Sequence, residues 1–217
     1  MNSAKHPAIV GALLKHAHGT YAQEADVGLE NEPAPLFRLL VFGLVSSTPI
    51  SASIAVATAR ELRKSGMSSA PTVKRAKRSD IIEALGRAHY VRYDESTATR
   101  LHELADRVDD VYGNDLRRLP KRAQFSVPEV KRLLQEFNGI GPTGADIFTR
   151  EVQAVWPWAR PYFDNRAIES ARGLGLPSDP DELAGYVRPE DVAELSAALV
   201  RISLDHELRA SVEEEFR

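Results

Sequence analysis

LQEFNGIGPTGA, at residues 134–145, predicts a helix that stops at a Gly-Ile-Gly turn and restarts at once. Gly139 and Gly141 permit positive φ and let another backbone come close. Pro142 suits the first turn of the new helix, where a missing N–H costs nothing. We therefore expect two helices joined by a tight glycine turn.

The turn also predicts an anion site. The backbone N–H groups of Gly141, Thr143 and Gly144 should point outward at the positive end of the second helix, where they would suit a DNA phosphate. The chain continues through WPWARP at residues 156–161 and reaches Asp164, at the N-cap position of a further helix.

This order of parts resembles the DNA glycosylases related to endonuclease III, the HhH-GPD superfamily. The resemblance covers about residues 35–176 and rests on the hairpin, the Gly/Pro-rich loop and the Asp that follows about twenty residues later. It implies an all-α fold of two helical lobes in one domain. Residues 36–125 would form a central lobe and residues 126–176 the hairpin and catalytic loop, with residues 1–35 and 177–217 completing the second lobe.

The resemblance also implies roles for individual residues. Asp164 takes the catalytic position. DNA-binding positions match Gly139, Ile140, Gly141, Thr143, Gly144, Thr48 and Arg166. A base pocket would be lined by Tyr93, Trp158, Tyr162 and Phe163. The backbone carbonyls that bind a structural Na⁺ or K⁺ in the family match Gln135, Phe137 and Ile140.

The chemistry implied is base excision from double-stranded DNA. A glycosylase acts on a base taken out of the stack, and the bond breaks through a sugar cation that one carboxylate can stabilise. Asp164 would supply that carboxylate. The position of the family's catalytic Lys is held by Thr143, which cannot form a Schiff base, so base removal without strand cleavage is expected.

Other interpretations stay open. Asp164 is also an ordinary helix N-cap, and the four aromatic side chains equally fit packing. Thr48 stands where the family often has a Gln that fills the gap left by the flipped base. A catalytically inactive helix-hairpin-helix DNA-binding protein is the alternative function, and a helical protein–protein module is a third.

Composition narrows the class of protein. The 217 residues include no cysteine, which excludes disulfides, thiolate zinc sites and iron–sulfur clusters. The lack of disulfides suits a cytosolic protein, and no apolar run is long enough for a membrane span. We expect no required cofactor, a monomer and a cytoplasmic, DNA-associated protein. The net charge of −3 is uneven: residues 178–217 carry −7 and the remainder +4, so the body can still present a basic face.

The rest of the chain predicts helices with no strand, at about residues 8–14, 36–45, 49–64, 81–85, 96–111, 126–137, 142–155, 164–173, 180–186 and 189–203. Thr48, Ser79 and Ser126 are expected to cap helices, the last in a capping box with Glu129. Lys74, Arg75, Lys77 and Arg78 form a basic run that is either solvated surface or a DNA-backbone contact. His16 and His18 are expected to be a surface pair, with metal binding as the alternative.

Overall fold

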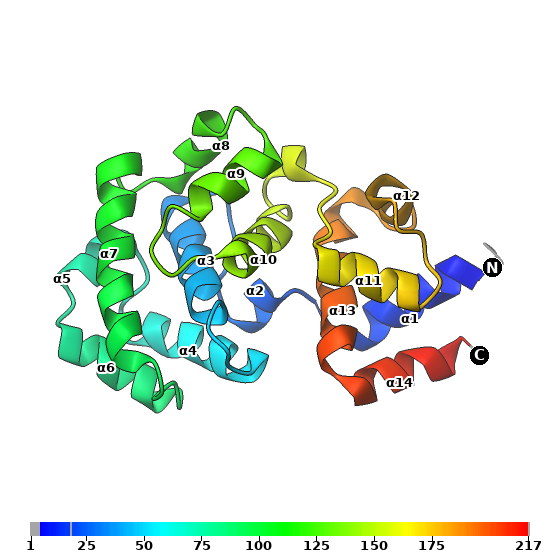
Figure 1. Ribbon diagram of the computed structural model, residues 1–217, viewed down its shortest axis with the longest axis horizontal. Helices are drawn as coiled ribbons and strands as arrows, with labels where there is room; N and C mark the ends of the chain where they lie inside the picture. The colour runs from blue at the N-terminus through cyan, green and yellow to red at the C-terminus, as the bar shows by residue number, and fades with distance from the viewer. Residues whose placement is uncertain (1–4, 18, 217) are drawn as a thin grey trace. The chain divides into compact units, whose positions relative to one another are not determined.

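The computed structural model describes residues 5–17 and 19–216, and this part of the chain is all-α, without a strand (Figure 1). The predicted fold class is therefore confirmed at the level of secondary structure. The helices are α1 (His6–Ala17), α2 (Tyr21–Glu24), α3 (Pro33–Ser46), α4 (Ala52–Lys64), α5 (Ala70–Arg75), α6 (Arg78–Arg87), α7 (Asp94–Tyr112), η2 (Leu116–Arg118), α8 (Leu119–Arg122), α9 (Val127–Leu134), α10 (Pro142–Val152), η3 (Pro157–Ala159), α11 (Asn165–Gly173), α12 (Pro180–Ala184), η4 (Pro189–Asp191), α13 (Val192–Leu204) and α14 (His206–Glu215).

The chain forms two compact units. The central unit is Ala22–Thr149, and the terminal unit combines the chain up to Tyr21 with Arg150–Arg217. This division keeps both hairpin helices, α9 and most of α10, with the central helices, and it groups Asp164 with the two ends of the chain. No helix in the described residues is long and apolar enough to cross a membrane.

The core of the central unit is built around α3. Its residues from Pro35 to Val45 are apolar almost all round, apart from Arg38, and nearly all of them are buried. An all-round apolar helix requires neighbours on every side. Accordingly α3 packs against α4 and η2, while α5 and α6 pack on the long helix α7.

Glycines let α3 and α10 approach closely. A Cβ atom on Gly43 would lie 3.1 Å from the Gly144 carbonyl oxygen, and one on Gly144 would lie 3.0 Å from the Gly43 carbonyl oxygen. The Ser47 hydroxyl also occupies this space, because a Gly144 Cβ would lie 2.2 Å from its Oγ. Any side chain at Gly144 would therefore push the second hairpin helix away from the core.

The hairpin helices have the predicted apolar stripe. Val130, Leu133 and Leu134 of α9 are buried, and Phe137 is buried just beyond its end. The predicted capping box is wrong in its contacts, because Ser126 is the N-cap residue but its side chain makes no cap hydrogen bond.

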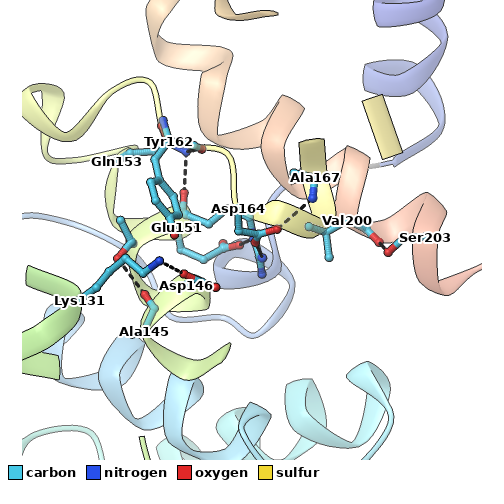
Figure 2. A network of polar contacts seen from close by, with 12 residues as sticks. Lys131, Ala145, Asp146, Glu151, Gln153, Tyr162, Asp164, Ala167, Val200 and Ser203 are labelled. Carbon is cyan, nitrogen blue, oxygen red and sulfur yellow. Dashed lines mark hydrogen bonds and ion pairs between the residues drawn. The ribbon is translucent and has the colours of Figure 1, made fainter. Parts of the chain in front are cut away.

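An ion pair holds α9 against α10: Lys131 Nζ lies 2.5 Å from Asp146 Oδ1 (Figure 2). On α10 the residues Ala145, Phe148 and Val152 are fully buried, whereas Ile147 is only half-buried.

Two other helix starts differ from the sequence prediction. The N-cap of α4 is Ser51, whose hydroxyl accepts from the Ile54 N–H at 3.3 Å, so the helix begins after Thr48 and Pro49. The N-cap of α6 is Lys77 rather than Ser79. In both places several polar residues precede the apolar stripe, and the sequence alone does not decide which of them ends the loop.

In the terminal unit, α13 is the buried helix. Its residues from Val192 to Val200 are buried except Glu194, and α1 and α11 both pack on it. The helix α14, which the sequence pattern did not predict, packs on α1, where Lys15 and His16 pair with Glu215. His18 lies outside the described residues.

Candidate functional site

The turn between α9 and α10 is shaped by Gly139. Its φ is +89°, a conformation that residues with a side chain rarely adopt. A Cβ atom there would also lie 2.7 Å from Leu44 Cδ1 and 2.8 Å from Arg100 Cδ. Both the backbone conformation and the neighbours from α3 and α7 explain this glycine without any ligand.

Gly141 is a different case. Its φ is not positive, and a Cβ atom would meet nothing within 4 Å. Pro142 and Thr143, which follow it, are exposed. The first backbone hydrogen bond onto α10 runs from the Ala145 N–H to the Gly141 carbonyl at 3.0 Å, so the N–H groups of Gly141 and Thr143 lack an acceptor within the described residues. This end of α10 is open at its positive pole.

The other predicted hairpin contacts point inward. Ile140 is 4 % exposed, and its N–H donates to the Phe137 carbonyl at 3.0 Å. Gly144 is buried against α3, whereas Gly141, Pro142 and Thr143 before it are not. The reason is the close crossing with Gly43, which places that side of α10 in the core.

The carbonyls proposed for Na⁺ or K⁺ fit only in part. The Phe137 carbonyl already accepts the Ile140 N–H, which leaves one lone pair for a cation. The described residues contain no group of three or more His, Asp or Glu side chains arranged to hold a metal ion. A cation at this turn would therefore depend on backbone oxygens, including that of Gln135.

Asp164 is the N-cap of α11, as predicted. Its Oδ1 accepts from the Ala167 N–H at 2.9 Å (Figure 2), and its Oδ2 accepts from Nη1 of Arg150 at 2.6 Å. The side chain is only 6 % exposed. Each carboxylate oxygen is thus engaged once, and about two of its roughly four acceptor positions remain.

A buried charge cluster surrounds this carboxylate. Arg150, near the end of α10, lies 3.4 Å from Oε1 of Glu151, which is fully buried. Burial disfavours the charged guanidinium, but the carboxylates of Glu151 and Asp164 outweigh it and raise the pKa of Arg150 above its usual value. Arg150 also lies over the ring of Tyr21, and Arg201 of α13 covers the same ring at 4.0 Å.

Sequence reasoning missed this cluster. Adjacent Arg and Glu residues near the end of a helix normally indicate a solvated face. The available signal was their position: Arg150 and Glu151 follow Phe148 and precede Val152, on the stretch of α10 that is buried.

The loop before Asp164 is held by Gln153. Its side-chain amide accepts from the Tyr162 N–H at 2.9 Å and donates to the Tyr162 carbonyl at 2.8 Å (Figure 2). Arg160 donates to the Gln153 carbonyl at 2.6 Å and also to Ala154. These bonds fix the path of the chain from η3 to the carboxylate.

The aromatic residues predicted for a base pocket are divided between the two units. Trp158 stacks on the buried Trp156, with ring centroids 5.6 Å apart. Tyr162 is half-buried, and Phe163 is 7 % exposed, so its ring is a packing element. Tyr93 belongs to the central unit, where it makes an edge contact with Tyr90.

Thr48 and Arg166 have contrasting environments. The Thr48 hydroxyl donates to the Val45 carbonyl at 2.8 Å and lies 2.9 Å from the hydroxyl of Tyr90, which also contacts Thr97. The hydroxyl of Thr48 therefore makes its hydrogen bonds within the central unit. Arg166 is exposed on the first turn of α11, and no ion pair with an acidic residue is made by it within the described chain.

The basic run is partly neutralised. Lys74 pairs with Asp106 and Asp109, and Arg78 pairs with Glu95. These contacts favour the solvated-surface interpretation for half of the run.

Comparison with known proteins gives no match: neither a family model, nor a curated protein, nor a solved structure is similar to this chain.

Proposed function

We propose that this chain binds double-stranded DNA through the turn between α9 and α10, and that it excises a damaged or mismatched base as a monofunctional HhH-GPD-type glycosylase. The observation that carries the proposal is the open end of α10. Gly141 has space on its side-chain side, and two N–H groups there lack acceptors in the described residues. A phosphate oxygen would satisfy those donors at the positive end of the helix.

Asp164 is the proposed catalytic group. Nη1 of Arg150 donates to Oδ2 of this carboxylate and the Ala167 N–H donates to Oδ1, so both oxygens are held in place. In the reaction the C1′–N bond breaks, positive charge develops on the sugar, water adds its oxygen to C1′, and the base leaves with a proton. A carboxylate whose position is fixed beforehand can stabilise the sugar cation without reorganising during the step.

Charge balance bears on how much stabilisation is available. Glu151 and Asp164 with Arg150 carry a net charge of −1, although Arg201 adds a cation across the Tyr21 ring. The hydrogen bond to Arg150 occupies one lone pair of the Asp164 carboxylate. The carboxylate can still attract the sugar cation through space.

A second candidate function is DNA binding without excision. It is favoured by the coverage of Asp164, which is 6 % exposed and bonded through both oxygens. A carboxylate that serves only to cap α11 and to neutralise Arg150 would have this environment.

Incubation of the protein with a panel of lesion-bearing duplexes, followed by alkali, separates the two candidates. Base excision leaves abasic sites that alkali converts to strand breaks, whereas a binding protein gives retarded duplex and no breaks. Without alkali no cleavage is expected, and borohydride should trap no covalent complex, because Thr143 has no amine. A trapped complex would contradict the monofunctional proposal, and failure to bind any duplex at low salt would contradict both candidates.

A further inference from the structure

Two basic clusters of equal spacing lie on helices of the central unit. On α4 the cluster is Arg60, Arg63 and Lys64. On the continuous helical segment of η2 and α8 it is Arg118, Lys121 and Arg122. In both cases the residues stand at positions i, i+3 and i+4 and so share one helix face. Their surroundings differ.

The α4 cluster is satisfied by the chain itself. Arg63 forms an ion pair with Asp26, and Lys64 Nζ lies 2.9 Å from Oε1 of Glu61. The Arg60 guanidinium donates to the Glu24 carbonyl at 2.7 Å. The three cations therefore serve contacts within the central unit.

No side chain of the α8 cluster forms an ion pair within 4 Å in the described residues, although Asp115 interacts with Arg118 at longer range. Arg118, Lys121 and Arg122 are all exposed. The Arg118 guanidinium lies beside Gly113, and that of Arg122 lies 6.0 Å from the ring centroid of Tyr112. Like charges at this spacing destabilise a helix. A bound polyanion would remove that repulsion.

Two carboxylates lie near the α8 cluster, but they form ion pairs with a different arginine. Arg117, directly before the cluster, lies 3.0 Å from Asp115 and 3.1 Å from Glu32. The two neighbouring carboxylates are thus both directed to Arg117. Arg118, Lys121 and Arg122 therefore form no ion pair with these two carboxylates.

An exposed aromatic ring follows the cluster. Phe125 is 60 % exposed. It and Gln124 have φ values of +55° and +51°, which residues with a side chain rarely adopt. The hydrogen bonds from the Phe125 N–H to the Pro120 carbonyl and from the Ser126 N–H to the Ala123 carbonyl, both 2.9 Å, hold this conformation. The chain therefore accepts an unfavourable backbone at a position where most of a large apolar ring is accessible to solvent.

We propose that Arg118, Lys121, Arg122 and Phe125 form a binding site for single-stranded DNA. The cations would contact successive phosphates, and an unstacked base would lie on the Phe125 ring. A duplex would satisfy the cations but would offer no base face to the ring, because its bases are stacked on one another. This site is separate from the Gly141 turn and does not depend on excision.

Fluorescence anisotropy with a labelled oligothymidylate of about 12 nucleotides, a length within the usual range of single-strand sites, tests the proposal. Phe125→Ala should weaken binding roughly 5- to 160-fold, the effect of losing one stacked base. Phe125→Trp should retain binding, whereas Phe125→Leu should behave like Phe125→Ala. The triple variant R118Q/K121Q/R122Q should reduce the slope of log K against log salt by about 2, since each phosphate contact on a single strand contributes about 0.7.

Matched variants control for general effects. R60Q/R63Q/K64Q removes the same charge at the same spacing and should leave the salt slope within about 0.5 of wild type, because those side chains already bond to Asp26, Glu61 and the Glu24 carbonyl. Leu204→Ala removes another exposed apolar side chain, 53 % exposed, and should not change the affinity.

Three results would overturn the proposal: equal loss of binding in both triple variants, unchanged affinity for Phe125→Ala, or equal competition by polyglutamate, which would indicate an acidic protein segment as the occupant. Gly141→Asp should leave oligothymidylate binding intact, so failure of the duplex proposal and failure of this one give different results.

Discussion

The helices α10 and α11 both begin after a loop, yet their N-termini are satisfied differently. At α11 the Asp164 side chain accepts the Ala167 N–H and the Arg150 guanidinium, so the helix end is closed by the chain. At α10 the preceding residue is Gly141, which has no side chain, and the end is open. Both ends carry the same helix dipole. The residue at the cap decides whether the chain itself or an external anion can use it.

The largest expected effect on stability comes from removing the Arg150 guanidinium that bonds to the N-cap of α11. Arg150→Met leaves Glu151 and Asp164 buried without their guanidinium. We expect the free energy of unfolding to fall by about 3–5 kcal/mol, the usual loss when one partner of a buried ion pair is removed. Urea unfolding followed by circular dichroism measures it.

Arg166→Met is the matched control for that prediction. Arg166 is exposed on α11, so its replacement should change the stability by no more than about 0.5 kcal/mol. Equal effects of the two substitutions would show that the buried cluster around Asp164 is not what stabilises the terminal unit.

Closing the open end converts α10 into a helix like α11. Gly141→Asp places a capping carboxylate where the phosphate is proposed to bind. Aspartate is a good N-cap, so stability should not fall. Duplex affinity should fall by about 1.5–3 kcal/mol, the worth of a hydrogen bond to a charged group, with little dependence on sequence or lesion. Salt-titrated binding curves decide it, and unchanged affinity at low salt would exclude the turn as the phosphate site.

The two turn glycines should respond differently to alanine. Gly139→Ala introduces a Cβ at φ +89°, 2.7 Å from Leu44, and should cost about 1–3 kcal/mol of stability. Gly141→Ala enters open space and should cost less than about 1 kcal/mol, the preference of an N-cap for glycine over alanine. Thermal melts of both variants test this difference. If both melt alike, the geometry given for the turn is incorrect.

The smallest effect is expected at Thr48. Its hydroxyl bonds to Val45 and Tyr90, so Thr48→Val should cost about 1 kcal/mol of stability and leave duplex binding unchanged. Thermal melts and duplex-binding curves of Thr48→Val and wild type test both parts of this prediction. A loss of lesion binding at unchanged stability would restore Thr48 as a residue that contacts DNA.

Local sequence patterns predicted the hairpin and the cap of α11 because each depends on residues close together in the chain. The apolar spacing of α9, the glycine at 139 and the proline at 142 act within one or two helical turns. The identity of Asp164 as an N-cap likewise depends on the three residues that follow it. The burial of α3 followed from its all-round apolar composition.

Contacts between distant residues were not predictable in the same way. The Arg150–Asp164 pair joins residues 14 apart across a loop whose path is fixed by Gln153, and nothing in the local pattern specifies that path. The burial of Gly144 depends on Gly43, which is 101 positions away. Which residues of the turn are buried was therefore decided by tertiary packing.

The most direct test is the single-turnover excision rate of Asp164→Asn on a duplex that the wild-type protein cleaves after alkali treatment. Asparagine keeps the size and the capping ability but removes the charge. We expect the rate to fall by about 10²–10³, as when one preorganised electrostatic stabiliser is lost, while duplex affinity is retained. Measurement well below the melting temperature of the variant separates chemistry from the weakened pairing of Arg150. Full excision by Asp164→Asn would contradict the proposed catalytic role.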